Sequence, residues 1–114
     1  MSEFYRDHNE LVNKILTYLH SQFTGRYWGN ATGAVKSESG HFQRYGLIGS
    51  SDIIGFTGQG RAVFIEVKTK NATLSSQQKK FGDATLRCNC IYIVAREDFI
   101  ETFNSSELQN DTNT

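Results

Sequence analysis

Residues 52–68, DIIGFTGQGRAVFIEVK, contain two short apolar runs with a turn sequence between them. Both runs, 52–56 and 62–68, are rich in Ile, Val and Phe, which are residue types that favour β-strands. Segment 57–60 carries two glycines and is typical of a hairpin loop. The sequence therefore predicts a β-hairpin here, and the remaining elements can be placed around it.

An amphipathic helix is predicted before this hairpin, over residues 6–23. Leu11, Ile15 and Leu19 recur at four-residue spacing and would form one apolar face of that helix. A short aromatic run at 26–31 follows the helix, and a Gly- and Ser-rich polar stretch comes next. We expect the aromatic run to form a weak strand and the polar stretch to form a long loop.

A second helix is predicted after the hairpin, over residues 76–87. Ser75 stands at the N-cap position and Gln78 follows three residues later, which is the pattern of a capping box. The apolar run 91–95 predicts a buried strand, and 97–103 predicts a short closing helix. The order α-β-β-β-α-β-α indicates an α/β fold with a mixed central sheet flanked by helices.

The 114 residues suffice for one hydrophobic core and are too few for two. We expect a single domain over residues 1–103 and a flexible polar tail over 104–114, where Asn, Ser and Thr predominate. Hydrophobic residues make up 38% and charged residues 21% of the chain, which excludes a disordered protein. Because no apolar run approaches the roughly 18 residues of a membrane span, we expect a cytoplasmic protein without a membrane partner.

The net charge of zero hides an uneven distribution of charge along the chain. Between Leu11 and Arg96 there are eleven Lys and Arg residues against four acids, and the other acids lie toward the two ends. A basic centre of this kind suits a protein that contacts a phosphate backbone. Two of the four central acids, Asp52 and Glu66, lie in predicted strands and require a separate explanation.

Asp52, Glu66 and Lys68 together suggest a metal site for phosphoryl chemistry. Alternate residues of a strand share one face, so the side chains of Glu66 and Lys68 point the same way. Pairing across the hairpin could bring Asp52 near Glu66, and two close carboxylates repel each other unless a cation joins them or one holds a proton. Their hard oxygen ligands favour Mg²⁺. Lys68 could then orient water or neutralise charge that develops on a phosphate.

A simpler interpretation treats Glu66 and Lys68 as an ion pair on a solvated strand surface, worth well under about 1 kcal/mol. A Glu and a Lys two residues apart are common by chance, so the pair alone favours this interpretation. The neighbouring motifs favour the metal site instead, because GSSDII at 49–54, FIEVK at 64–68 and LSSQQ at 74–78 occur in this order on suitable predicted elements.

This set of motifs resembles the PD-(D/E)xK nuclease superfamily, and within it the small stand-alone VRR-NUC members of phage and bacterial type. Segments 30–34 and 46–52 resemble the region that precedes the catalytic motifs in that branch, so the resemblance covers nearly the whole chain. It implies a restriction-endonuclease-like α-β-β-β-α-β core. It also implies a metal-dependent DNA endonuclease in the cytoplasm of a bacterium or of a phage-infected host cell.

The same resemblance assigns roles to individual residues. Asp52 and Glu66 would be acidic metal ligands, the backbone carbonyl of Val67 would complete the metal shell, and Lys68 would be the catalytic lysine. Gln78 would face the site from the second helix, although the capping box explains a glutamine there equally well. We expect Mg²⁺ as the cofactor, Mn²⁺ as a substitute, and no organic cofactor.

Two positions depart from the pattern of the superfamily. Ser51 stands where its signature has proline, which shapes the backbone there and takes no part in the chemistry. Many members place an acid on the first helix, and Glu10 is our choice for it, with Glu3, Asp7 and His8 as rivals. An acid in the first helical turn is explained equally well by the helix dipole. The histidines His8, His20 and His41 lack metal-ligand spacing and are expected to be solvated or structural.

The substrate is expected to be DNA held through its phosphates. Lys36, Arg44, Lys70 and Lys79 surround the expected site in sequence and are candidate phosphate contacts. The resemblance implies branched or four-way junction DNA that is cut by a homodimer, because one site of this size cuts one strand. The alternative from another class is a nucleic-acid-binding module without catalysis, in which the acids serve only the structure.

Overall fold

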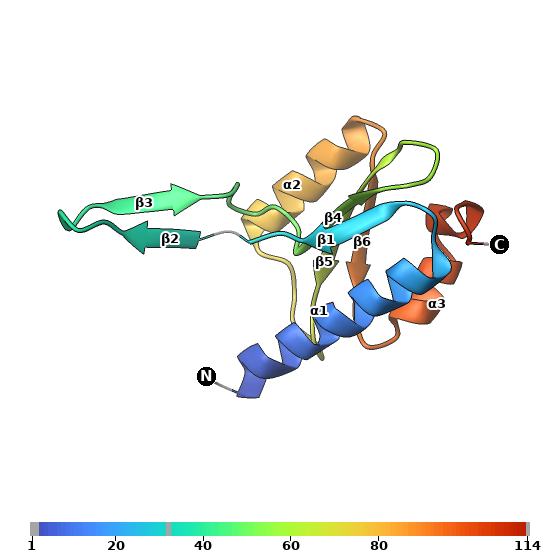
Figure 1. Ribbon diagram of the computed structural model, residues 1–114, viewed down its shortest axis with the longest axis horizontal. Coiled ribbons are helices and arrows are strands. Elements are labelled where there is room, and N and C mark those ends of the chain that lie inside the picture. The colour runs from blue at the N-terminus through green and yellow to red at the C-terminus, as the bar shows by residue number, and fades with distance from the viewer. Residues whose placement is uncertain (1–2, 32, 114) are drawn as a thin grey trace.

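The computed structural model describes residues 3–31 and 33–113. Its elements follow one another in the order α1 (Glu3–Gln22), β1 (Arg26–Gly29), β2 (Gly33–Lys36), β3 (Phe42–Tyr45), β4 (Ile53–Phe56), β5 (Ala62–Val67), α2 (Ser76–Arg87), β6 (Ile91–Ala95), α3 (Phe99–Asn104) and the 3-10 helix η1 (Glu107–Asn110). Figure 1 shows the sheet between the helices, with α2 and α1 on opposite sides of it. The predicted α/β fold is confirmed, and it is consistent with a restriction-endonuclease-like core.

The central sheet has the strand order β1-β4-β5-β6. Strands β1, β4 and β5 pair antiparallel, and β6 joins β5 in parallel, so the sheet is mixed. The predicted hairpin is confirmed as the β4–β5 pair, with Ile53 opposite Ile65 and Phe56 opposite Ala62. The antiparallel hairpin fixes the register of the residues that follow and precede it, including Asp52 and Glu66.

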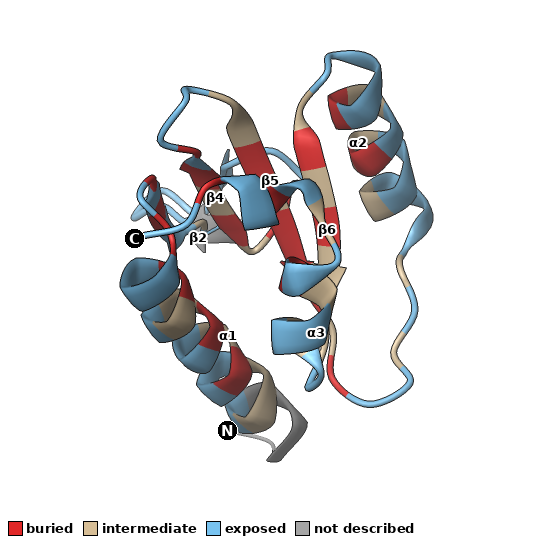
Figure 2. Ribbon diagram, turned by 90° about the vertical axis from the view of Figure 1, so that its right-hand side faces the viewer, coloured by how far each residue is buried: buried red, intermediate tan, exposed pale blue. Residues whose placement is uncertain are grey.

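The main core lies between α1 and one face of the sheet. Leu11, Ile15 and Leu19 of α1 are buried in one cluster with Ile53 and Ile65 of the central strands. Figure 2 shows these buried positions on one side of α1 and along the middle of the sheet. Each such side chain contributes roughly 1.5–3 kcal/mol on burial, so this face anchors α1. Among the described residues, no helix combines the length and the apolar character needed to cross a membrane.

Helix α2 covers the other face of the sheet beside β5 and β6. The predicted capping box is present: the Ser75 hydroxyl accepts from the backbone N–H of Gln78 at 3.1 Å, and Oε1 of the Gln78 side chain accepts from the backbone N–H of Ser75 at 2.8 Å. The ring of Phe81 packs edge-on against Phe64. A Cβ at Gly82 would lie 2.8 Å from the ring of Tyr92, so glycine permits the close approach of α2 to the sheet.

The aromatic run predicted as a weak strand is confirmed as β1, whereas the polar stretch predicted as a long loop is instead a second hairpin, β2–β3. It extends from the body along the longest axis of the molecule, which measures 52 × 32 × 24 Å (Figure 1). A turn at 37–40 closes this arm, with Gly40 at a φ of +89°. Every side chain of β3 is exposed, so this strand has no buried face. Hydrophobic periodicity therefore could not reveal it.

The segment after Asn104, predicted to be a flexible polar tail, is packed on the domain. Leu108 is 0% exposed, and the amide of Asn113 donates to the carbonyl of Gln22 at 2.7 Å. The Asp111 carboxylate accepts hydrogen bonds from the Gly58 amide at 2.8 Å and from the Thr24 hydroxyl. The tail prediction is corrected for this reason: a single buried leucine and one aspartate hold a polar segment against the core.

Candidate active site

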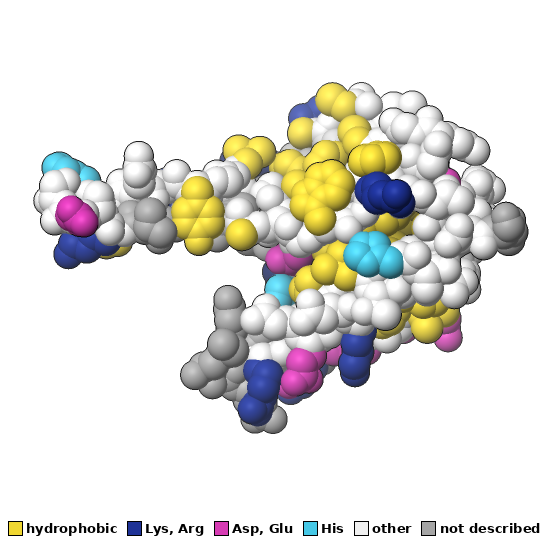
Figure 3. Space-filling model, viewed as in Figure 1, with side chains coloured by type: hydrophobic (Ala, Val, Ile, Leu, Met, Phe, Trp, Pro, Cys, Tyr) yellow, Lys and Arg dark blue, Asp and Glu magenta, His cyan; other side chains and the backbone are white. Residues whose placement is uncertain are grey.

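The predicted site residues meet in a pocket of about 260 Å³ at one end of the β4–β5 hairpin, beside the N-terminal halves of α1 and α2. Acidic, basic and imidazole side chains are visible in the notch between the β2–β3 arm and α1 (Figure 3). The pocket is lined by His8, Asp52, Glu66, Val67, Lys68, Thr69, Ala72 and Gln78. The structure therefore brings together residues from α1, from both strands of the hairpin and from α2.

Asp52 is held by the backbone of the neighbouring strand. Its Oδ2 accepts a hydrogen bond from the Val67 amide at 2.8 Å. Its own carbonyl accepts from the Asn30 amide at 2.7 Å, which ties it to the end of β1. Ser51, in place of the proline of the superfamily pattern, is buried and donates its hydroxyl to the Ile53 carbonyl at 2.9 Å. The serine thus satisfies its own polar group and leaves Asp52 facing the pocket.

Glu66 is the most unusual group in the pocket because it is only 2% exposed. Its Oε1 accepts from Gln78 Nε2 at 3.0 Å, and within residues 3–31 and 33–113 its Oε2 has no hydrogen-bond partner. Burial is the main cause that raises the pKa of Glu66 to about 9, and the negative charge of the adjacent Asp52 carboxylate raises it further. The positive charge of Lys68 acts in the opposite direction.

The interpretation of Glu66 and Lys68 as a solvated surface ion pair is wrong. Glu66 is buried, and in the described part of the chain Lys68 forms no salt bridge. A half-buried ammonium without an ion-pair partner lines the same pocket as a buried carboxyl group. Both groups therefore remain available for a ligand.

Gln78 fills two roles that sequence analysis treats as alternatives. Its side-chain oxygen caps α2 by accepting from the Ser75 amide, and its side-chain nitrogen donates to Glu66. The two bonds use opposite ends of one amide group, so they do not compete. The capping box thereby positions the amide that holds Glu66.

The residue of the first helix that lines the pocket is His8, and Glu10, the acid chosen from the sequence, lies outside it. Glu10 is exposed on α1 and does not line the pocket. His8 Nε2 lies 3.1 Å from the Val67 carbonyl oxygen and 3.5 Å from Asp52 Oδ2. The helical spacing contains a signal for this choice, because His8 lies three residues before Leu11 and seven before Ile15 and so shares their inward face.

Sequence analysis also missed Thr69, which lies directly after Lys68. Thr69 is buried and lines the pocket, and its hydroxyl lacks a hydrogen-bond partner in the part of the chain that is described. A hydroxyl of this kind is not distinguishable from an ordinary strand threonine in the sequence. With the free oxygen of Glu66, it gives the pocket lining two unsatisfied polar atoms.

The four basic residues predicted to contact phosphates are all exposed and lie outside the pocket. Lys36 and Arg44 lie on the arm, and Lys79 lies in the first turn of α2. Lys70 follows the end of β5, and its amide donates to the carboxylate of Glu97. These residues lie on three separate parts of the chain: the arm, the segment after β5 and α2.

The donor atoms in the pocket fit a hard divalent cation. No group of three or more His, Cys, Asp or Glu side chains in the described residues is arranged to hold a metal. Asp52 and Glu66 nevertheless offer two carboxylates, and Mg²⁺ typically takes one or two carboxylates and keeps several waters. Glu66 Oε2 has no hydrogen-bond partner among the described residues, and the two carboxylates repel each other. A divalent cation between them would satisfy the oxygen and remove the repulsion.

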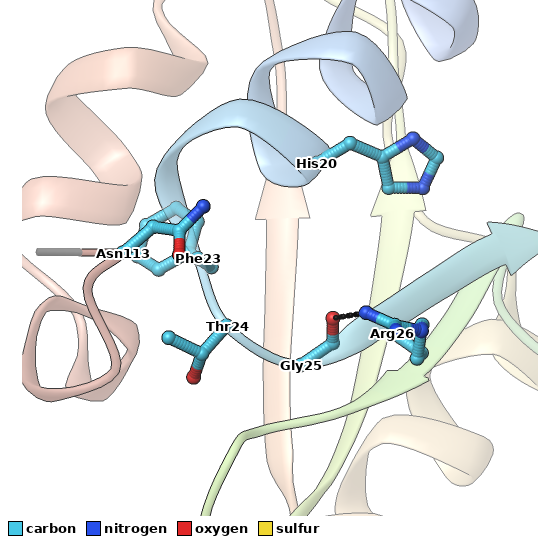
Figure 4. Close-up of a pocket in the computed structure, with 6 residues that line it drawn as sticks. All are labelled: His20, Phe23, Thr24, Gly25, Arg26 and Asn113. Atoms are coloured by element: carbon cyan, nitrogen blue, oxygen red, sulfur yellow. Dashed lines mark hydrogen bonds between the residues drawn. The ribbon is translucent and has the colours of Figure 1, made fainter.

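A second pocket, of about 360 Å³, lies at the other end of α1 and has different chemistry (Figure 4). It is lined by His20, Phe23, Thr24, Gly25, Arg26 and Asn113 and contains no carboxylate. His20 Nε2 lies 2.8 Å from the Tyr27 carbonyl oxygen. Its larger volume therefore does not make it the better candidate for catalysis.

Comparison with known families agrees with this geometry. A model of the VRR-NUC domain family matches residues 9–98, which include Asp52, Glu66, Lys68 and Gln78. No curated protein and no solved structure matches the chain.

Proposed function

The chain belongs to the VRR-NUC domain family, a family of PD-(D/E)xK nuclease type, and on this premise we propose that it is a metal-dependent DNA endonuclease. One observation carries the proposal: a buried Glu66 shares a pocket with Asp52 and Lys68, and among the residues described Glu66 Oε2 has no hydrogen-bond partner and Lys68 has no ion-pair partner. Perturbed acids beside a lysine in a pocket are typical of catalytic sites.

We assign Asp52, Glu66 and the main-chain oxygen of Val67 as the groups that would hold Mg²⁺, with Mn²⁺ as a substitute. The ion, when bound, would polarise the scissile phosphate and lower the pKa of the attacking water. Gln78 fixes Oε1 of Glu66, so Oε2 is the oxygen left for the ligand. The Val67 amide fixes Oδ2 of Asp52 in the same way.

Lys68 carries the charge that the reaction needs. When water attacks phosphorus, one bond to water forms, the bond to the leaving oxygen breaks, and negative charge grows on the phosphate oxygens. The ammonium of Lys68 would stabilise that charge and orient the water. His8, at hydrogen-bond distance from the Val67 carbonyl, is a positioning residue for the strand that carries Glu66 and Lys68.

We propose branched DNA, including four-way junctions, as the substrate and a homodimer as the active form. One pocket of this kind serves one phosphodiester, so cutting both strands of a junction requires two copies related by symmetry. The exposed basic residues of the arm and of α2 suit contacts to the phosphate backbone on either side of the pocket.

The experiment is cleavage of labelled four-way junction, flap and linear duplex DNA in Mg²⁺, Mn²⁺ or EDTA. The wild-type protein is expected to cut in either metal and not in EDTA, and Lys68→Ala is expected to lose about 10² to 10³ in rate. The matched control is Lys14→Ala, which removes an exposed lysine of α1 outside the pocket. Thermal melts show that each variant is folded, and sedimentation gives the oligomeric state.

The outcomes separate the candidate functions. Metal-dependent cutting that Lys68→Ala abolishes and Lys14→Ala retains supports the endonuclease. Binding of all three DNAs in EDTA without cutting in any metal would instead identify a nucleic-acid-binding module. Equal cutting of all three DNAs would contradict the preference for branched substrates and leave a general nuclease.

A further inference from the structure

The candidate catalytic pocket continues into a second hollow along α1. This hollow, of about 420 Å³, shares His8 and Asp52 with the pocket and extends to Asn9, Asn30 and Tyr45. Tyr45 is the last residue of β3, so the hollow ends at the base of the β2–β3 arm. Figure 3 shows the notch that the arm and the N-terminal half of α1 form on this side of the molecule. The two hollows thus make one groove. We call its outer part, the hollow of about 420 Å³ that ends at Tyr45, the arm groove.

The lining of the arm groove suits a nucleobase better than a phosphate. Asp52 at its inner end is the only charged carboxylate of the described lining, and Asn9, Asn30 and Tyr45 offer neutral polar atoms and one aromatic ring. Tyr45 is 46% exposed, so its ring is open to a ligand. Aromatic rings of this kind bind unpaired bases by stacking.

Asn30 supplies a fixed hydrogen-bonding edge in the same groove. Its Nδ2 donates to the Ser50 hydroxyl and to the Ser51 carbonyl, both at 2.9 Å. These bonds fix the orientation of the side-chain amide and use its nitrogen, so Oδ1 remains as an acceptor. An exocyclic amine of a base could donate to it.

The arm carries net positive charge, and Arg44 precedes Tyr45 at the base of the arm. Between residues 36 and 45 it carries Lys36 and Arg44 against one acid, Glu38, and all three side chains are exposed. This charge suits the phosphates of a strand that passes along the arm. Tyr45 and Asn30 would therefore contact the base of a nucleotide, and the basic side chains of the arm would contact the phosphates of its strand.

We propose that the arm groove is a binding subsite for one unpaired nucleotide of the DNA substrate, beside the scissile phosphate, with its base stacked on Tyr45. A volume of about 420 Å³ lies within the range of pockets that hold a ligand of this size. A base inside an intact duplex is stacked on both sides and cannot reach the ring. The inference rests on the proposed function and gives it a basis for preferring branched, bulged or flapped DNA.

The test measures binding in EDTA, where no cutting occurs, with a DNA duplex that carries a single unpaired 2-aminopurine and with the fully paired duplex. Stacking on Tyr45 is expected to quench the 2-aminopurine fluorescence. Tyr45→Ala is expected to remove this quenching and to weaken binding of the bulged DNA about tenfold, with less than about twofold effect on the paired duplex. Tyr45→Phe keeps the ring and is expected to behave as the wild type.

The control is Phe42→Ala, which removes an aromatic ring that is 74% exposed on the same strand and outside the groove. It is expected to leave the binding preference unchanged. The subsite is overturned if Tyr45→Ala affects both DNAs equally or neither of them, even though the protein cuts DNA. If no DNA is cut in any metal and the Tyr45-dependent preference persists, the endonuclease proposal fails and the subsite stands.

Discussion

Two buried carboxyl groups lie near opposite ends of α1 and serve different purposes. Glu66 is 2% exposed and Asp111 is 6% exposed, and in the described chain each has one carboxyl oxygen without a hydrogen-bond partner. Asp111 uses its other oxygen to join the β4–β5 turn at Gly58 to Thr24, which follows α1. Glu66 receives one bond from the side chain of Gln78 and lines an open pocket.

The charged neighbours distinguish the two groups more clearly than burial does. Asp111 lines a smaller hollow of about 140 Å³ with Arg61, whose charge is already paired with Glu107. Glu66 lies beside a second acid, Asp52, and beside Lys68, which has no ion-pair partner in the described residues. Both acids have a carboxyl oxygen without a hydrogen-bond partner among the described residues, but only Glu66 also lies near a cation without an ion-pair partner there. This combination distinguishes the candidate active site from the structural site at Asp111.

Replacing Glu66 gives the largest expected effect on activity. Glu66→Gln keeps the shape and removes the carboxylate, so the cleavage rate is expected to fall by about 10² to 10³ while the melting temperature holds or rises. Asp111→Asn is the matched change at the other end of α1 and should retain most of the rate at 25 °C. Equal losses of rate in the two variants, measured by single-turnover cleavage, would remove the distinction drawn between the two acids.

Replacing Asp111 gives the largest expected effect on stability. Asp111→Ala leaves the Gly58 amide and the Thr24 hydroxyl without their acceptor, so the free energy of unfolding is expected to fall by about 2–3 kcal/mol. Urea unfolding measures this change. Asp98→Ala serves as the control, because Asp98 precedes α3 without a side-chain capping bond and should change stability little. A loss below that of the control would mean that the tail is not fastened by this carboxylate.

Replacing His8 tests whether the N-terminal half of α1 contributes to activity. His8→Ala removes the contacts to the Val67 carbonyl and to Asp52, and we expect cleavage to slow by about tenfold, as for residues that position metal ligands. Glu10→Ala changes an exposed side chain of the same helix and should leave the rate unchanged. If Glu10→Ala cleaves DNA more slowly than the wild type and His8→Ala cleaves it at the wild-type rate, Glu10 and not His8 is the functional residue of the first helix.

A further expected effect is a dependence of stability on pH in the metal-free protein. The pKa of Glu66 is raised to about 9 in the folded state, above the ordinary value of 4.5. Its contribution to stability is therefore complete below about pH 4.5 and is lost as the pH rises through about 9. Thermal melts in EDTA are expected to show a melting temperature that falls between pH 5 and pH 9. In Glu66→Gln this fall should be smaller. A profile that is the same in both proteins would mean that Glu66 is already ionised when folded.

The parts of the fold that follow from local pattern could be predicted from the sequence. The β4–β5 hairpin has alternating apolar runs around a glycine turn, and α2 begins at a complete capping box. The motif spacing likewise pointed to Asp52, Glu66 and Lys68, and the family resemblance pointed to Gln78. The structure brings all four into one pocket. Each of these predictions depends on residues close together in sequence or on one hairpin.

The remaining parts depend on long-range contacts that composition conceals. Strand β3 of the arm has no buried side chain, so it lacks the periodicity that reveals the other strands. The C-terminal segment is polar throughout except for Leu108, and its position is set by Asp111 acting across the fold. The choice of His8 over Glu10 depends on the rotation of α1 about its own axis, which the acid pattern alone does not give.

The shared amide of Gln78 has a consequence for how occupancy of the pocket could be observed. Because one side chain caps α2 and also holds Glu66, a ligand that draws on the Glu66 carboxylate must pull on the first turn of α2. The backbone amide protons of Ser75 and Gln78 are then natural reporters. Their NMR chemical shifts and their exchange with deuterium should respond to Mg²⁺ even though neither amide touches the pocket ligand directly.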